Sequence, residues 1–263
     1  MNASFQERYE AGNSLVHHLD SRVKVLTALL LILGIVLTPP EAWPAYPLLW
    51  ALIGSLAVVS NIGAWRLARL GGLALPFTLA ATTLLFSTPG RPILTIIGLT
   101  ISDAGSARFA AIVLKSWLSI QVALLLSITT HFTDLLWALS SLHVPETLIA
   151  IVGFMYRYLF TLQDEAQRLL RARSARSATS PNQKSGGSLT WRAQVAGGMV
   201  GNLFLRSYQR SERVYAAMQS RGYKGQIRAL TVTPLTWTAI LYGSVPIVAL
   251  VIIEALAILW WSK

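Results

Sequence analysis

The sequence of 263 residues contains no cysteine and has little charge, since only 13% of its residues are Asp, Glu, Lys or Arg. The lack of cysteine excludes disulfides, thiolate metal sites and cysteine nucleophiles. A soluble domain carries about 25% charged residues, so the deficit argues against an ordinary soluble globular protein. Acidic residues are scarcer than basic ones. Eleven Asp and Glu stand against 22 Lys and Arg, which gives a formal net charge of +11.

Apolar sequence is abundant, at 54% of the residues with a mean hydropathy of +0.53. This excludes a disordered chain. Five apolar runs cover residues 23–37, 43–59, 73–86, 109–128 and 235–261. A helical membrane span needs roughly 20 residues, which the first and third runs reach only with their flanks. The sequence therefore predicts an all-α, polytopic membrane protein with about five transmembrane helices and a cytoplasmic pair of long helices.

The distribution of basic residues predicts the orientation in the membrane, because cytoplasmic loops are enriched in Lys and Arg. Arg22 precedes the first run and Lys24 lies at its start, and Arg66 and Arg69 lie between the second and third runs. The segment 131–231 carries thirteen Lys and Arg against five Asp and Glu. These parts are therefore predicted to be cytoplasmic and the C-terminus to lie outside. On the outer side, residues 93–102 are β-branched and predict a short hairpin or re-entrant element.

The predicted organisation has four parts. Residues 1–22 form a cytoplasmic N-terminal segment, 23–130 hold transmembrane helices one to four, 131–231 form a cytoplasmic or interfacial domain, and 232–263 form the last transmembrane helix. No cleavable signal peptide is evident, because the first 22 residues are polar and mixed in charge.

Three helices are predicted within the cytoplasmic segment. A short amphipathic helix covers 131–142, with Thr133 as a possible cap. A long helix covers 145–177, apolar in its first half and charged in its second. After a linker at 178–190, a second long helix runs from 191 to about 221, has an apolar stripe on one face, and stops at Gly222, where a C-cap glycine is expected.

Both long helices end in arginine beside small residues. The candidate site consists of Arg173, Arg176 and Ser177 on the first helix and Ser220, Arg221 and Gly222 on the second, with Arg168, Arg206, Arg210, Arg213 and Met218 in support. An arginine fork offers several donors to carboxylates or carbonyls, so these ends could dock on a soluble partner. They could also be solvated basic ends that attract anionic lipid.

Three motifs resemble the transmembrane T component of energy-coupling factor (ECF) transporters, the CbiQ type of cobalt uptake systems. Residues 15–24 (LVHHLDSRVK) resemble the family's Leu-His-x-Leu-Asp-Pro-Arg-x-Lys, with Ser21 in place of proline. Residues 173–177 (RSARS) resemble an Ala-Arg-Gly signature, and spacing favours Arg176 as its arginine. Residues 212–223 (ERVYAAMQSRGY) resemble Glu-Arg-x-x-x-Ala-Met-x-Ala-Arg-Gly-Phe, the most specific match.

The resemblance implies a non-catalytic subunit that couples two ABC-type ATPase subunits to a membrane substrate-binding subunit of the CbiM type, with a small auxiliary membrane subunit as a possible further partner. It implies that ATP is bound by the ATPases, that this chain needs no cofactor and binds no metal, and that the complex lies in the lipid bilayer of a bacterial cytoplasmic (inner) membrane. Cobalt ion is the expected substrate, with nickel or a vitamin as alternatives.

Other functions find less support in the sequence. An intramembrane enzyme of unknown chemistry is the first rival, but Asp103 and Arg108 match only part of a phosphotransferase motif. A metal site at His17 and His18 lacks carboxylate partners. No nucleic-acid motif accompanies the basic residues, so we expect no nucleic-acid partner. Lys115 and Glu254 lie within apolar runs, where charge is either functional or placed so that it snorkels to the interface.

Overall fold

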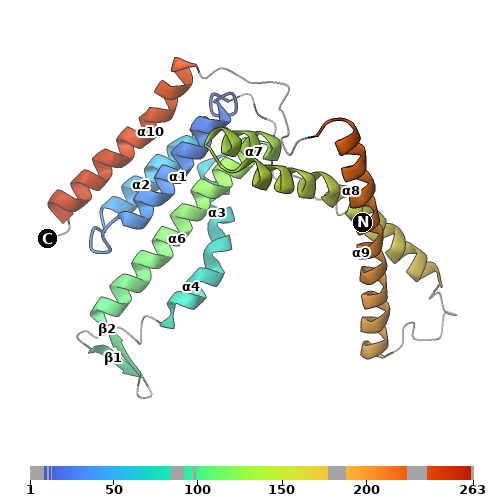
Figure 1. Cartoon of the computed structure of the whole chain (residues 1–263). Helices are drawn as coiled ribbons and strands as arrows, with labels where there is room; N and C mark the ends of the chain where they lie inside the picture. Colours follow the sequence, from blue (N-terminus) through green and yellow to red (C-terminus); the bar gives the residue numbers. More distant parts are fainter. Residues whose placement is uncertain are drawn as a thin grey trace. The chain divides into compact units, whose positions relative to one another are not determined.

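The computed structural model describes residues 9–10, 12, 14–83, 92–96, 99–176, 188–223 and 236–261. The chain divides into two compact units, one formed by Met1–Leu142 with Thr231–Lys263 and the other by His143–Leu230. Figure 1 shows the helices and strands of both units.

The first unit consists of short and long helices and one hairpin. Its elements are α1 (Ser21–Leu37), α2 (Ala45–Val59), α3 (Ala64–Leu70), the 3-10 helix η1 (Gly71–Ala74), α4 (Leu75–Ala81), β1 (Pro92–Ile96), β2 (Leu99–Ser102), α6 (Asp103–Thr129), α7 (Phe132–Ser141), α10 (Trp237–Leu256) and the π-helical turn η2 (Ala257–Trp261). β1 and β2 pair antiparallel, at the place where the β-branched residues 93–102 predict a hairpin.

Two helical stretches of the described residues are long and apolar enough to cross a membrane, Gly105–Thr129 and Trp237–Leu259. A third span is present if α2 and the following Ala64–Ala74 are taken together, although this pair is bent by 116°. The bend falls where Asn61 and Gly63 have φ values of 58° and 81°, a conformation that ends a helix. Within the third apolar run, residues 73–81 belong to the short helices η1 and α4, and the predicted count of five spans stays a prediction.

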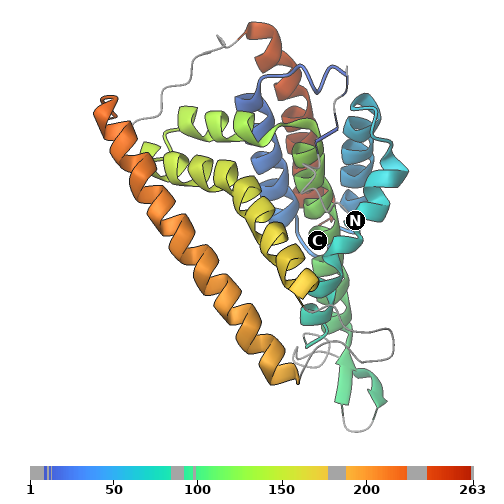
Figure 2. The same ribbon diagram turned by 90° about the vertical axis from the view of Figure 1, so that its right-hand side faces the viewer.

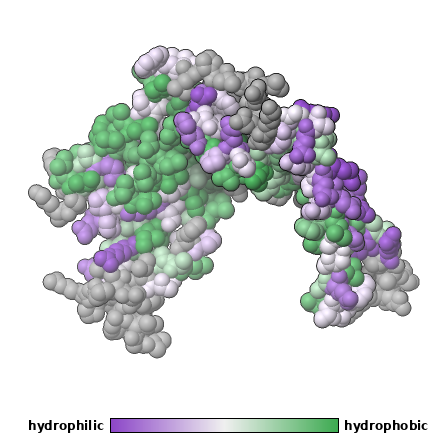
Figure 3. All heavy atoms as spheres, viewed as in Figure 1, coloured by the Kyte–Doolittle hydropathy of each residue, from purple (hydrophilic) through white to green (hydrophobic). Residues whose placement is uncertain are grey.

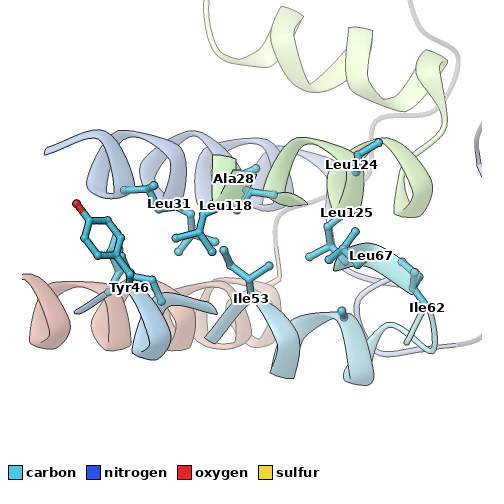
Figure 4. Close-up of a cluster of buried hydrophobic side chains, with 14 of the residues drawn as sticks. Ala28, Leu31, Tyr46, Ile53, Ile62, Leu67, Leu118, Leu124 and Leu125 are labelled. Carbon is cyan, nitrogen blue, oxygen red and sulfur yellow. The ribbon is translucent and has the colours of Figure 1, made fainter. Parts of the chain in front are cut away.

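The core of the first unit lies between α1, α2 and α6. Figure 4 shows Leu31, Ile53 and Leu118, one from each of these helices, pointing toward one another, and all three are buried. α10 packs closely on α1, because a Cβ added at Gly243 would lie 2.0 Å from a methyl carbon of Val23. Small residues allow such close approach of helices in membranes.

The short helix predicted at 131–142 is observed as α7 (Phe132–Ser141). Thr133 is not its cap. The helix begins one residue earlier, and His131 occupies the N-cap position with extended backbone (φ −64°, ψ 147°) and no capping bond from its side chain. A residue that already has helical dihedrals in the first turn cannot be the half-extended cap residue.

The second unit contains the two long helices that the sequence predicts. α8 spans Glu146–Arg176 and α9 spans Leu189–Ser220. The space-filling view shows mainly hydrophobic residues over the helices of the first unit, whereas hydrophilic residues gather on α8 and α9 (Figure 3). No residue of α9 is fully buried, so the two helices expose most of their surface within this unit.

Candidate functional site

The ribbons of α8 and α9 cross each other in Figure 1 and lie close together at one end in Figure 2, and Glu165 of α8 joins the two helices. Its carboxylate oxygens lie 3.4 Å from a guanidinium nitrogen of Arg206 and 3.6 Å from one of Arg210. Glu165 is the less exposed partner, with 19% of its side chain accessible. One acid of α8 therefore joins two arginines that lie four residues apart on one face of α9.

The predicted apolar stripe of α9 is less exposed than the rest of the helix. Val195, Met199, Leu203, Val214 and Met218 are all half-buried in a helix that is otherwise mainly exposed, and Val214 and Met218 face α8 across a groove. Between the two helices lies a largely apolar groove of about 860 Å³. Aromatic side chains from both helices and from the residue after the α9 cap line it: Phe154, Tyr158, Phe204, Tyr208, Tyr215 and Tyr223.

Large apolar side chains of the first half of α8 are also exposed within this unit. Leu148, Ile151 and Met155 have more than half of their surface accessible. Figure 3 shows hydrophobic residues among the hydrophilic ones over this region. Contiguous exposed apolar surface of this kind marks an interaction site with a protein or a membrane.

The end of α9 is a Schellman motif, as the predicted C-cap glycine requires. Gly222 has φ +82°, and its N–H donates to the carbonyl of Gln219 at 3.0 Å. The N–H of Tyr223 donates to the carbonyl of Met218, also at 3.0 Å. These two bonds satisfy carbonyls that the helix leaves unpaired. The motif holds the exposed Arg221 at a defined helix end, beside Ser220, whose hydroxyl donates to the carbonyl of Ala217.

The end of α8 carries the other candidate arginines. Arg168 and Arg176 are exposed and Arg173 is half-buried. Ser177 lies outside the described residues. Of the supporting residues on α9, Arg206 and Arg210 join the crossing, Arg210 and Met218 line the groove, and Arg213 is exposed.

Arg176 and Arg221 stand at opposite ends of the helix pair. Met218, near the end of α9, lines the groove together with Thr147 and Ala150, near the start of α8. Arg176 is 26 residues beyond Ala150, which corresponds to about 40 Å along α8 at 1.5 Å per residue. The two arginine ends therefore cannot enter one small binding groove together.

Sequence reasoning missed Glu165 as the acid of the crossing. The sequence feature that points to such an acid is the spacing of Arg206 and Arg210, which are four residues apart and therefore place two cations on one face of α9. The sequence cannot say which acid of α8 meets them, because the register of two helices joined by a long linker is set by their contact.

The imidazole of His17 is held by hydrogen bonds within the N-terminal segment. The Nδ1 atom of His17 lies 2.6 Å from the Ser14 hydroxyl, and Nε2 lies 3.1 Å from the carbonyl oxygen of Glu10. Both ring nitrogens are thus engaged. Within the described ranges, no group of three or more His, Asp and Glu could hold a metal ion.

Comparison with known proteins gives one family and several similar proteins. A model of the CbiQ family, described as cobalt transport protein, matches residues 12–233. A protein of Listeria innocua named energy-coupling factor transporter transmembrane protein EcfT is 30% identical over 230 residues, which cover 83% of this chain and 84% of that protein. Proteins of the same name from Thermanaerovibrio acidaminovorans and Brevibacillus brevis are 29% and 26% identical, over 88% and 97% of this chain and 87% and 96% of their own lengths.

Proposed function

Because the chain belongs to the CbiQ family of cobalt transport proteins, we propose that it is the T component of an ECF transporter, which passes ATP-driven movement to a membrane substrate-binding subunit. The observation that carries this proposal is the pair of crossed helices α8 and α9, each of which ends in exposed arginine. The relatives named energy-coupling factor transporter transmembrane protein support the same role.

The arginine ends are proposed to bind two ABC-type ATPase subunits. Arg176 and Arg221 are exposed, and a guanidinium matches carboxylates and carbonyls with several donors at once. The separation of about 40 Å along α8 favours two ATPase grooves over one. When ATP closes the ATPase pair, the two ends move relative to each other, and the Glu165 crossing turns that movement into a change of the groove.

The groove between α8 and α9 is proposed to contact the substrate-binding subunit of the CbiM type. Its wall is apolar and aromatic, as expected of a surface that meets another membrane protein. The exposed Leu148, Ile151 and Met155 extend this surface along α8. A small auxiliary membrane subunit would complete the complex.

We infer cobalt ion as the transported substrate, from the description of the family. Nickel ion and a vitamin are the alternatives. The substrate is bound by the partner, and ATP is bound by the ATPases, so this chain is proposed to carry no catalytic residue and no cofactor. We place it as a multi-pass protein of the bacterial cytoplasmic (inner) membrane, with five spans.

The test is to change Arg176 and Arg221 to Ala, singly and together, in the assembled transporter. We expect the double variant to insert in the membrane but to lose ATPase co-purification and uptake of radioactive cobalt. Arg157→Ala, an exposed arginine in the first half of α8, is the control and should leave both intact. The docking role is wrong if the double variant retains ATPases and uptake. Competition by nickel or a vitamin would identify the alternative substrates.

A further inference from the structure

The junction between α6 and α7 is short and lacks helical hydrogen bonding. α6 ends at Thr129 and α7 begins at Phe132, so only two residues join them. Thr130 has extended backbone (φ −134°, ψ 128°), as does His131. Two extended residues between helices form a point at which the chain can bend unless other groups hold it.

Lys24 of α1 holds the carboxyl end of α6. Its Nζ atom donates to the carbonyl oxygen of Thr129 at 3.1 Å and to that of His17 at 2.9 Å, and Lys24 is only 8% exposed. The described last turn of α6 carries no basic residue of its own. The cation that matches the negative end of the α6 dipole therefore comes from another helix.

A backbone group of the N-terminal segment binds the next carbonyl. The N–H of Glu10 donates to the carbonyl oxygen of Ile128 at 3.1 Å. The Glu10 carboxylate in turn pairs with Arg66 of α3, which fixes this part of the segment. Two successive carbonyls at the end of α6 are thus satisfied by residues that precede the first apolar run or lie near its start.

The same segment holds α7 on the other side of the junction. The guanidinium carbon of Arg22 lies 4.0 Å from the ring centroid of Trp137, within the range of a cation–π interaction. The rings of Tyr9 and His131 lie 3.5 Å apart between centroids. Asp20 fixes the backbone of Arg22 at the start of α1, because its carboxylate accepts a hydrogen bond from the Arg22 N–H at 2.9 Å and caps the helix.

We propose that Lys24 and Arg22 are positioning residues that lock the α6–α7 corner, Lys24 by capping α6 and Arg22 by stacking on Trp137. This rests on the proposed function, since four residues of chain lead from α7 to α8, the first of the two helices proposed to move with the ATPases. Force applied to α8 reaches the membrane helices through this corner. A locked corner passes the movement on, and a loose corner absorbs it by bending.

The direct test measures the corner itself and needs neither ATPases nor substrate. The cysteine-free chain accepts two spin labels at Ala123→Cys on α6 and Ser140→Cys on α7, which are both exposed. In nanodiscs we expect a single narrow distance distribution, and a distribution at least twice as wide after Lys24→Met. Lys115→Met is the matched control, because Lys115 also donates to a helix-terminal carbonyl, that of Val36 at the end of α1.

A second pair of variants keeps the proposal testable if Lys24→Met, a substitution at a buried position, prevents the chain from folding. Trp137→Leu should widen the distribution, whereas Trp137→Tyr, which keeps an aromatic face, should restore it. An unchanged width in both Lys24→Met and Trp137→Leu would overturn the proposal. Equal widening in Lys115→Met would overturn it too, because the effect would then be general loosening.

The functional test is the amount of substrate imported per ATP hydrolysed by the assembled transporter. Lys24→Met should lower this ratio about tenfold, which corresponds to about 1.4 kcal/mol of lost coupling, while ATPases stay bound. A widened corner with an unchanged ratio would refute the positioning role. Failure of the proposed function is recognised separately, because then the unaltered chain would neither retain ATPases nor support uptake.

Discussion

The hydroxyl of Thr38, at the end of α1, donates a hydrogen bond to Oε1 of Glu254 of α10 across 2.6 Å. In the same last turn of α1, the carbonyl of Val36 accepts a hydrogen bond from Lys115 of α6 at 2.9 Å. Lys115 and Glu254 thus both bind the carboxyl end of α1. Partners of this kind reduce the cost of charge within a membrane.

Thr38→Val should lower the free energy of unfolding of the purified chain by about 1.5–3 kcal/mol, because a hydrogen bond to a charged group contributes about this much. The variant keeps the shape of a side chain that is 1% exposed. Unfolding in detergent measures the change. Ser55→Ala is the control, since this exposed hydroxyl bonds only locally to the carbonyl of Leu52. Equal losses in the two variants would contradict the importance of the link to Glu254.

Glu165→Ala should loosen the crossing of α8 and α9. Exposed ion pairs contribute about 0–1 kcal/mol, so amide exchange in the middle of α9 should become faster by roughly two- to fivefold. Asp164→Ala removes the neighbouring exposed acid and should leave exchange in α9 unchanged. High salt should speed exchange in the unaltered chain and have little effect on the Glu165 variant.

Gly222→Ala should fray the end of α9, because a residue with a Cβ loses about 1–2 kcal/mol in the left-handed conformation that Gly222 adopts at φ +82°. Amide exchange at position 222 and at Tyr223 should rise, and ATPase binding should weaken. The control is Gly201→Ala in the interior of α9, where an added Cβ meets open space and alanine favours the helix. An unaffected helix end in Gly222→Ala would show that the Schellman motif does not hold Arg221.

The stability of the N-terminal segment should fall on acidification through His17. Burial lowers the pKa of His17 below its usual value, the carbonyl of Glu10 opposes this, and the charges of Lys24 and His18 add to the lowering. The unfolded chain, with a histidine pKa of about 6.5, then binds the proton first. Stability is complete above about pH 6.5 and is lost as the pH falls through the lower pKa of the folded chain.

Thermal unfolding of the chain between about pH 8 and about pH 5 measures this effect, since linkage relates its slope to proton uptake. The unaltered chain should lose more stability over this interval than His17→Asn, which has no imidazole to protonate. Parallel curves for the two proteins would exclude His17 as the titrating group.

Several features of the fold follow from local sequence. The extents of α8 and α9 agree with prediction within one or two residues, because apolar periodicity, Pro145 and Gly222 act over one or two helical turns. The C-cap at Gly222 and the hairpin at 93–102 follow for the same reason. The prediction of Thr133 as a cap is wrong, because residues on both sides of a helix start can have capping side chains, and backbone dihedrals decide between them.

The sequence by itself determined the apolar helices, the two arginine-tipped helices and the family, since these depend on composition, short spacings and motifs. Only the tertiary structure decided the partners: Glu165 with Arg206 and Arg210, Lys24 with Thr129, and Thr38 with Glu254. Lys24 and Thr129 are 105 residues apart, and Thr38 and Glu254 are 216 apart. Contacts at such separations depend on how helices pack and in which register they meet, and no local pattern encodes that choice.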